Sequence, residues 1–463
     1  MKTNMILAMV ATSAVLPALA APEISNMSLE RSANSHLVTI SYDLSEDAIV
    51  TVQVTTNGVA LPQSAYGNMG GKVHRVVTQG TGHQIWWNPP TREMDALVAA
   101  GSAEVKLSAW AKDDPPDYLA IDLLATNCWR FYVTADDVPL GVTNRLYKSS
   151  KMLMRKIYAK DIQWPAGISS DRMDGTENYT TNILHRPHYV TLTYNYYIGI
   201  YEVTYSQYRN AACYSYSGTS YVIDKEIGTA SVTANGVTKV YDVIPADQKQ
   251  AVFWPTAWLK PEDMRGHSPS SAYWPKHGHN VPATSGLGYF RKRTGLDLDL
   301  TTEAEWEYAC RAGESKALYT GKRFSTPANV YELAWSSSNW NQDPACPSNQ
   351  LHEVGLLKPN AWGLYDMLGN GFEVCLDAML DTQSGVDEVD PYHGASVTDP
   401  VGPAGTSTYR RARRGGSVFS SVNATPYAGM TYNSSRADTR VNIAWGSGYP
   451  STAFRFALPA VIP

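Results

Sequence analysis

The stretch Gly363–Cys375, which reads GLYDMLGNGFEVC, decides how the rest of this chain is interpreted. Its three glycines allow sharp turns that point backbone carbonyls inward. Oxygen-bearing side chains stand within and just before it, at Asn360, Asp366, Asn370 and Glu373. Such a loop either orders itself through hydrogen bonds between side chains and backbone, or wraps a hard cation such as calcium, which prefers several oxygen ligands.

Length and composition indicate a β-rich or loop-rich globular protein of two or three domains. The chain has 463 residues, which exceeds one ordinary core, and only 17% of them are charged, against 29 Tyr and 13 Trp. The formal net charge is −5 and no basic run is present. A nucleic-acid partner is therefore not expected, because its electrostatic footprint is missing.

Residues 1–20 have the pattern of a signal peptide. Lys2 precedes an apolar run, Met5–Leu16, and Ala18-Leu19-Ala20 matches an A-x-A cleavage site. The apolar run is too short to span a bilayer, and no later stretch reaches spanning length. We expect cleavage near Ala20 and an exported protein (periplasmic, cell-surface or secreted) without a membrane span.

Three further segments follow the signal peptide. Residues 21–112 contain short alternating strands and a hairpin signal at Asn57-Gly58, which predicts an all-β sandwich of immunoglobulin or fibronectin III style. Residues 113–164 open with an acidic, proline-containing stretch and are interpreted as a linker or bridging segment. Residues 165–463 form the second domain.

The second domain is expected to be loop-rich, with few regular elements. Thr204 and Gln207 form a capping box that predicts a helix start, and so do Thr302 and Glu305. The second box predicts a helix over Glu303–Arg311 that ends at Gly313, where a left-handed residue costs little.

Five motifs in this domain resemble the sulfatase-modifying-factor family, whose fold is that of formylglycine-generating enzymes. In chain order they are Tyr196–Gln207 (YYIGIYEVTYSQ), Leu300–Gly313 (LTTEAEWEYACRAG), Pro359–Cys375 (PNAWGLYDMLGNGFEVC), Arg413–Ser417 (RRGGS) and Ala453–Ala457 (AFRFA). The resemblance implies a compact, loop-rich α+β domain related to C-type lectins. It does not cover residues 21–150.

The family resemblance implies copper chemistry that this chain departs from. Family members that oxidise a sulfatase cysteine to formylglycine carry two cysteines, five residues apart, shortly after the RGGS motif. The matching positions here are Ser420 and Thr425, and no cysteine follows Cys375. Because copper(I) requires soft thiolate ligands, copper and a catalytic residue are not expected, and the domain is interpreted as a pseudoenzyme.

The resemblance also implies a structural calcium ion. Its ligands would be the side chains of Asp366 and Glu373 and the backbone carbonyls of Gly369 and Gly371. Carboxylates with carbonyls suit calcium. The alternative is that the two carboxylates accept N–H bonds within the loop.

Three functions stay open. The preferred one is binding of a protein or glycan at the cell envelope, through the aromatic and small polar residues of 417–451. The second is a copper-dependent formylglycine-generating oxidase, and the third is a non-haem iron oxidoreductase using His185 and His188 or His277 and His279. Disulfide pairing also stays open among Cys128, Cys213, Cys310, Cys346 and Cys375.

Overall fold

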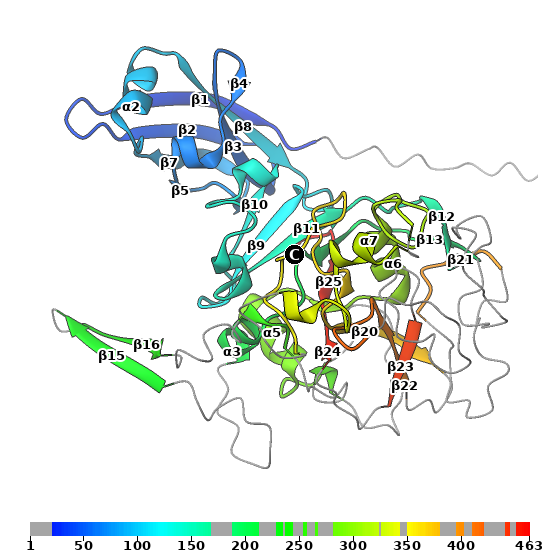
Figure 1. Cartoon of the computed structure of the whole chain (residues 1–463). Coiled ribbons are helices and arrows are strands. Elements are labelled where there is room, and N and C mark those ends of the chain that lie inside the picture. Colours follow the sequence, from blue (N-terminus) through cyan, green and yellow to red (C-terminus); the bar gives the residue numbers. More distant parts are fainter. Residues whose placement is uncertain are drawn as a thin grey trace, which may run out of the picture.

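The computed structural model shows a mixed α/β protein in which strands dominate, with a β-rich N-terminal module beside a larger unit (Figure 1). It describes residues 21–167, 188–212, 228–234, 237–243, 253–256, 264–266, 281–323, 326–342, 350–379, 395–401, 410–420, 440–444 and 451–463. In these parts of the chain, no helix is long and apolar enough to cross a membrane.

The N-terminal module consists of two antiparallel sheets that enclose one apolar core. The first sheet has the order β1 (Ile24–Arg31), β2 (Val38–Leu44), β7 (Gly80–Trp87), β5 (Met69–Gly71). The second has the order β4 (Val59–Ala60), β3 (Ala48–Thr56), β6 (Arg75–Val77), and β8 (Ala103–Trp110) also pairs with β3. Two helices complete it, α1 (Gln63–Tyr66) and α2 (Arg92–Ala99). The predicted turn at Asn57-Gly58 is confirmed, since both residues have positive φ and connect β3 to β4.

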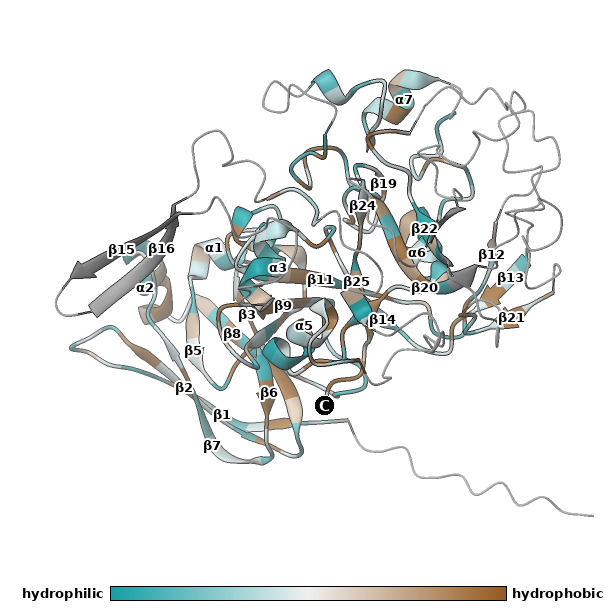
Figure 2. Ribbon diagram, turned by 90° about the horizontal axis from the view of Figure 1, so that it is seen from below, coloured by the Kyte–Doolittle hydropathy of each residue, from teal (hydrophilic) through white to brown (hydrophobic). Residues whose placement is uncertain are grey.

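A six-stranded sheet forms the centre of the larger unit. Its order is β10 (Trp129–Tyr132), β9 (Tyr118–Asp122), β11 (Lys151–Ile157), β14 (Tyr196–Gly199), β25 (Phe456–Pro459), β17 (Asp299–Leu300). Residues 113–164 therefore supply three strands of this sheet, with the short helices η1 (Ala135–Asp137) and η2 (Arg145–Lys148) between them. In Figure 2, β9 and β11 are largely coloured as hydrophobic, consistent with their buried side chains.

Smaller sheets surround this centre. One sheet joins β12 (Gln163–Ala166), β13 (His188–Thr191) and β21 (Val397–Thr398). Two smaller sheets pair β15 (Gly228–Ala234) with β16 (Val237–Val243) and β18 (Ala334–Trp335) with β19 (Leu368–Gly369). The last sheet has the order β23 (Arg440–Ala444), β22 (Arg410–Arg414), β20 (Phe372–Met379), β24 (Thr452–Ala453). The hairpin β15–β16 lies within residues 215–245, a stretch rich in Gly, Ser and Thr.

Both predicted capping boxes are present. Thr204 and Gln207 exchange their side-chain bonds at the start of α3 (Tyr205–Ala212). Thr302 and Glu305 do the same for α6 (Glu303–Arg311), but the left-handed cap is Ala312, one residue before the predicted Gly313. The remaining helices are α5 (Gly286–Thr294), α7 (Pro327–Tyr331) and η7 (Trp340–Gln342).

The N-terminal module contacts the central sheet through His74. This buried residue bonds through Nδ1 to the carbonyl of Phe131 (2.9 Å), and its own carbonyl accepts the N–H of Phe131 (2.9 Å). Its ring lies 4.8 Å from that of Tyr132. Burial lowers the pKa of His74 to about 4, and nearby Arg130 acts in the same direction.

The depressed pKa of His74 predicts a loss of stability in mild acid. In the unfolded chain the imidazole has its ordinary pKa near 6.5. Between pH 6.5 and about 4 the unfolded state therefore binds a proton that the folded state does not bind, so the free energy of unfolding falls as the pH drops through this range. The shift corresponds to about 3 kcal/mol. We expect the variant His74→Asn, which can donate the same bond and tolerates the positive φ of this position, to remove most of that slope. Urea unfolding of both proteins between pH 7 and 4 measures it, and parallel pH curves would contradict the assignment.

Candidate functional site

The centre of the candidate site is a buried ion pair between Glu373, at the start of β20, and Arg455, just before β25. The Arg455 guanidinium donates to both carboxylate oxygens of Glu373, at 2.8 to 3.2 Å. It also donates to the carbonyls of Gly199 (2.8 Å) and Tyr365 (2.7 Å). The indole N–H of Trp306, on α6, donates to Glu373 as well (2.9 Å). The pair of Glu373 and Arg455 thus joins the central sheet, helix α6 and the stretch Gly363–Cys375, which we call the glycine loop.

Two further buried carboxylates lie close to this pair. Glu202 accepts the N–H of Gly371 (3.0 Å) and a side-chain N–H of Asn370 (2.8 Å), while Asp366 accepts the N–H of Gly355 (2.6 Å). Burial raises the pKa of Glu202 well above its usual value, and the charges of Asp366 and Glu373 add to the effect. Burial likewise raises the pKa of Asp366 to about 6. Sequence reasoning did not select Glu202 as a site residue, although it stands in the first quoted motif.

The glycine loop is held in an unusual backbone conformation. Asp366, Gly369 and Asn370 all have positive φ, between 53° and 75°. The N–H of Gly369 donates to the carbonyl of Gly415 (2.8 Å), and the carbonyl of Asn370 accepts the N–H of Val418 (2.9 Å). The loop is therefore bonded directly to the turn that contains the RGGS motif.

Ser420 closes this turn. Its buried hydroxyl oxygen accepts the N–H of Ser417 (2.8 Å), and its own N–H donates to the carbonyl of Ser417 (2.8 Å). Its carbonyl accepts the N–H and the hydroxyl of Ser337, both at 3.0 Å. The side chain thus has a turn-forming role. Thr425 lies outside the described residues, and so do His185, His277 and His279, whereas His188 is in β13.

Two of the predicted calcium ligands, Asp366 and Glu373, are buried carboxylates that already accept hydrogen bonds within the protein. Glu202, Asp366 and Glu373 face one buried guanidinium, so the cluster has more acidic than basic groups. Both oxygens of Glu373 are bonded to Arg455, with which a calcium ion would have to share them. Within the described ranges, no group of three or more His, Cys, Asp or Glu side chains could hold a metal ion. The predicted set contains two carboxylates and two carbonyls, and it stays a prediction.

Comparison with known proteins identifies the scaffold. A model of the sulfatase-modifying factor enzyme 1-like domain matches residues 165–442. This chain belongs to that family. The resemblance inferred from the five motifs is thus confirmed. Among family relatives, the formylglycine-generating enzyme of Bos taurus is 25% identical over 219 residues, which cover 46% of this chain and 56% of that protein. That of Thermomonospora curvata is 29% identical over 212 residues, or 43% and 65% of the two chains. The chain thus spans less than two thirds of the length of either relative.

Solved structures similar to this sulfatase-modifying-factor chain include two bacterial proteins. PvdO from Pseudomonas aeruginosa is 19% identical with a TM-score of 0.43, covering 66% of this chain and 94% of that one. Treponema denticola variable protein 1 is 22% identical with a TM-score of 0.39, covering 67% and 95%.

Proposed function

We propose that this chain is an exported, non-catalytic member of the sulfatase-modifying-factor family that binds a protein or glycan at the cell envelope. In this proposal residues 1–20 are removed as a signal peptide, and an immunoglobulin- or fibronectin III-like N-terminal module carries the binding domain.

The observation that carries the non-catalytic part of the proposal is the environment of Ser420. This residue stands where the family resemblance implies the first copper-binding cysteine. Its oxygen is buried and already accepts the N–H of Ser417. A serine hydroxyl is a poor ligand for copper(I). Because this hydroxyl already accepts a hydrogen bond within the turn, binding a metal would also cost that bond. Of the cysteines described in this structure, Cys310 and Cys375 are buried, and burial raises the pKa of both thiols. Cys128 is half-buried and precedes β10, far along the chain from Ser420, and Cys213 and Cys346 lie outside the described residues.

The second candidate function is a formylglycine-generating oxidase, which is favoured only by the names of the relatives. The third, an iron oxidoreductase, has no support among the described residues. Both predict a redox metal that the binding function does not need.

Metal analysis of the full chain, purified without chelators, separates these functions. We expect calcium at about one ion per chain, held by Asp366, Gly369, Gly371 and Glu373, and neither copper nor iron. The matched variant is Asp366→Asn, because asparagine also tolerates the positive φ and can still accept the N–H of Gly355. It should fold and lose the calcium. Stoichiometric copper or iron would contradict the proposed function, and calcium retained by the variant would contradict the ligand assignment.

A further inference from the structure

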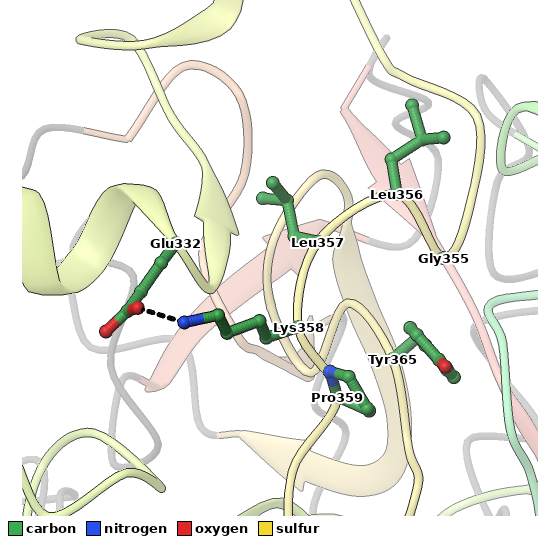
Figure 3. A pocket seen from close by; sticks show the side chains of 7 residues that line it. All are labelled: Glu332, Gly355, Leu356, Leu357, Lys358, Pro359 and Tyr365. Atoms are coloured by element: carbon green, nitrogen blue, oxygen red, sulfur yellow. Dashed lines mark hydrogen bonds and ion pairs between the residues drawn. The ribbon is translucent and has the colours of Figure 1, made fainter.

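An open groove lies beside the glycine loop, on the surface of the sulfatase-modifying-factor domain. It has a volume of about 510 Å³ and is lined by residues 355–359 together with Glu332 and Tyr365 (Figure 3). We call it the 355–359 groove. The family comparison gives no role for this groove, and the groove is separate from the buried pair of Glu373 and Arg455.

The apolar part of the groove is formed by two leucines, a proline ring and a tyrosine ring. Leu356 is 46% exposed, and Leu357 beside it is half-buried. Figure 3 shows Leu356 and Leu357 on one side of the hollow and Pro359 and Tyr365 on another. This surface is suited to the body of an apolar side chain.

The groove is preformed. The ring of Tyr365 lies 5.1 Å from that of Tyr201, and its carbonyl accepts a bond from Arg455. Gly355 has a φ of +72°, and a Cβ there would lie 2.4 Å from the Tyr201 ring, so only glycine lets the chain pass so close. The N–H of Lys358 is fixed to the carbonyl of Glu332. Because these contacts already hold the surface in place, binding a ligand costs little conformational entropy in the groove.

The polar end of the groove is formed by Glu332 and Lys358, and Lys322, which pairs with Glu332 but does not line the groove, adds a further positive charge. Glu332 is shared by Lys322 and Lys358, of which the side chains are 48% and 65% exposed. The bonds from Lys322 and Lys358 lower the pKa of Glu332, which stays ionised, so the three groups have a net charge of +1. Glu353, two residues before Gly355, is likewise shared by two cations, Arg145 and Lys148.

We infer that the 355–359 groove binds an extended peptide segment of a protein partner, in which an apolar side chain stands next to an acidic one. The apolar side chain lies against Leu356, Leu357 and Tyr365, and the carboxylate meets Lys358. Lys322, which pairs with Glu332, adds positive charge near this end. A peptide fits better than a glycan because, apart from the Glu332–Lys358 pair and the Tyr365 hydroxyl, the lining side chains offer no hydrogen-bonding groups. This inference rests on the proposed binding function and gives it a partner class and a surface at the 355–359 groove. The surface expected at 417–451 lies mostly outside the described residues.

The test uses the full chain and an array of short peptides in which leucine, phenylalanine or serine precedes glutamate, lysine or glutamine. We expect retention of Leu-Glu and Phe-Glu peptides, and not of Ser-Glu or Leu-Lys peptides. Affinity for a fluorescein-labelled Leu-Glu peptide should fall about tenfold or more in Lys358→Glu and decrease with added salt. It should also fall in Leu356→Ser, and stay unchanged in Lys106→Glu, which makes the same charge change at an exposed position of β8.

Three results would overturn the inference: no peptide bound, peptides bound equally by Lys358→Glu and Leu356→Ser, or retention on a glycan array alone. Because Lys358 and Leu356 are largely exposed, both variants should fold, which their melting temperatures check. Each of these results leaves the non-catalytic assignment standing, since that assignment depends on the metal content and on the absence of thiol oxidation.

Discussion

Replacing Arg455 by methionine is expected to lower the free energy of unfolding by about 3–5 kcal/mol, among the largest effects of any single substitution in this chain. The guanidinium is fully buried and donates to Glu373, Gly199 and Tyr365. Methionine fills a similar space but removes the positive charge. The buried carboxylate of Glu373 then has no cationic partner, and the protein interior solvates its charge poorly. Urea unfolding monitored by tryptophan fluorescence measures the change.

The matched control is Arg31→Met in the N-terminal module. Arg31 makes the same kind of pair with Asp95, but the two side chains are 24% and 21% exposed. Its loss should cost about 1 kcal/mol or less, because water solvates the remaining carboxylate. Adding Glu373→Gln to Arg455→Met should recover part of the loss, since a neutral amide can still accept the Trp306 N–H. Equal costs for the two arginine variants would show that the buried pair does not organise the site.

The second large effect is expected for Gly369→Ala. Gly369 has a φ of +75°, and a Cβ there would lie 2.3 Å from the carbonyl oxygen of Trp335 and 2.7 Å from its nitrogen. Alanine must therefore separate β19 from β18 as well as adopt a left-handed conformation. Gly363→Ala is the control, because its φ is +76° and no atom lies within 4 Å of its Cβ position.

We expect Gly363→Ala to lower the free energy of unfolding by about 1–2 kcal/mol, because alanine must adopt a left-handed backbone conformation but meets no neighbouring atom. Gly369→Ala should cost at least about 2 kcal/mol more, because a collision with backbone cannot be relieved by moving a side chain. Equilibrium unfolding of both variants gives the difference. Similar values would mean that the loop yields easily, and that its bonds to Gly415 and Val418 do not brace the RGGS turn.

Local signals in the sequence predicted local structure well. The capping boxes at Thr204 and Thr302 and the Asn57-Gly58 turn require only residues a few positions apart, so composition and spacing suffice to find them. The immunoglobulin style of the N-terminal module is a finer claim than its two sheets and shared core establish.

Contacts between distant residues could not be predicted in this way. Glu202 meets Gly371, 169 positions away, and Arg455 meets Glu373, 82 positions away. Both stand in quoted motifs, yet nothing in a single sequence states that they share one buried cluster. Similarly, the sequence of residues 113–164 is interpreted as a linker or bridging segment, whereas the place of this segment in the central sheet depends on β14, which follows much later.

The most direct test of the central claim is incubation of the full chain with copper(I), oxygen and a peptide of the form Cys-x-Pro-x-Arg, followed by mass spectrometry. The relative from Thermomonospora curvata serves as the positive control. The account predicts that the peptide thiol persists, because Ser420 stands where the family resemblance implies a copper-binding thiolate and its oxygen is already bonded to Ser417. Conversion of the thiol to an aldehyde with repeated turnover would contradict it.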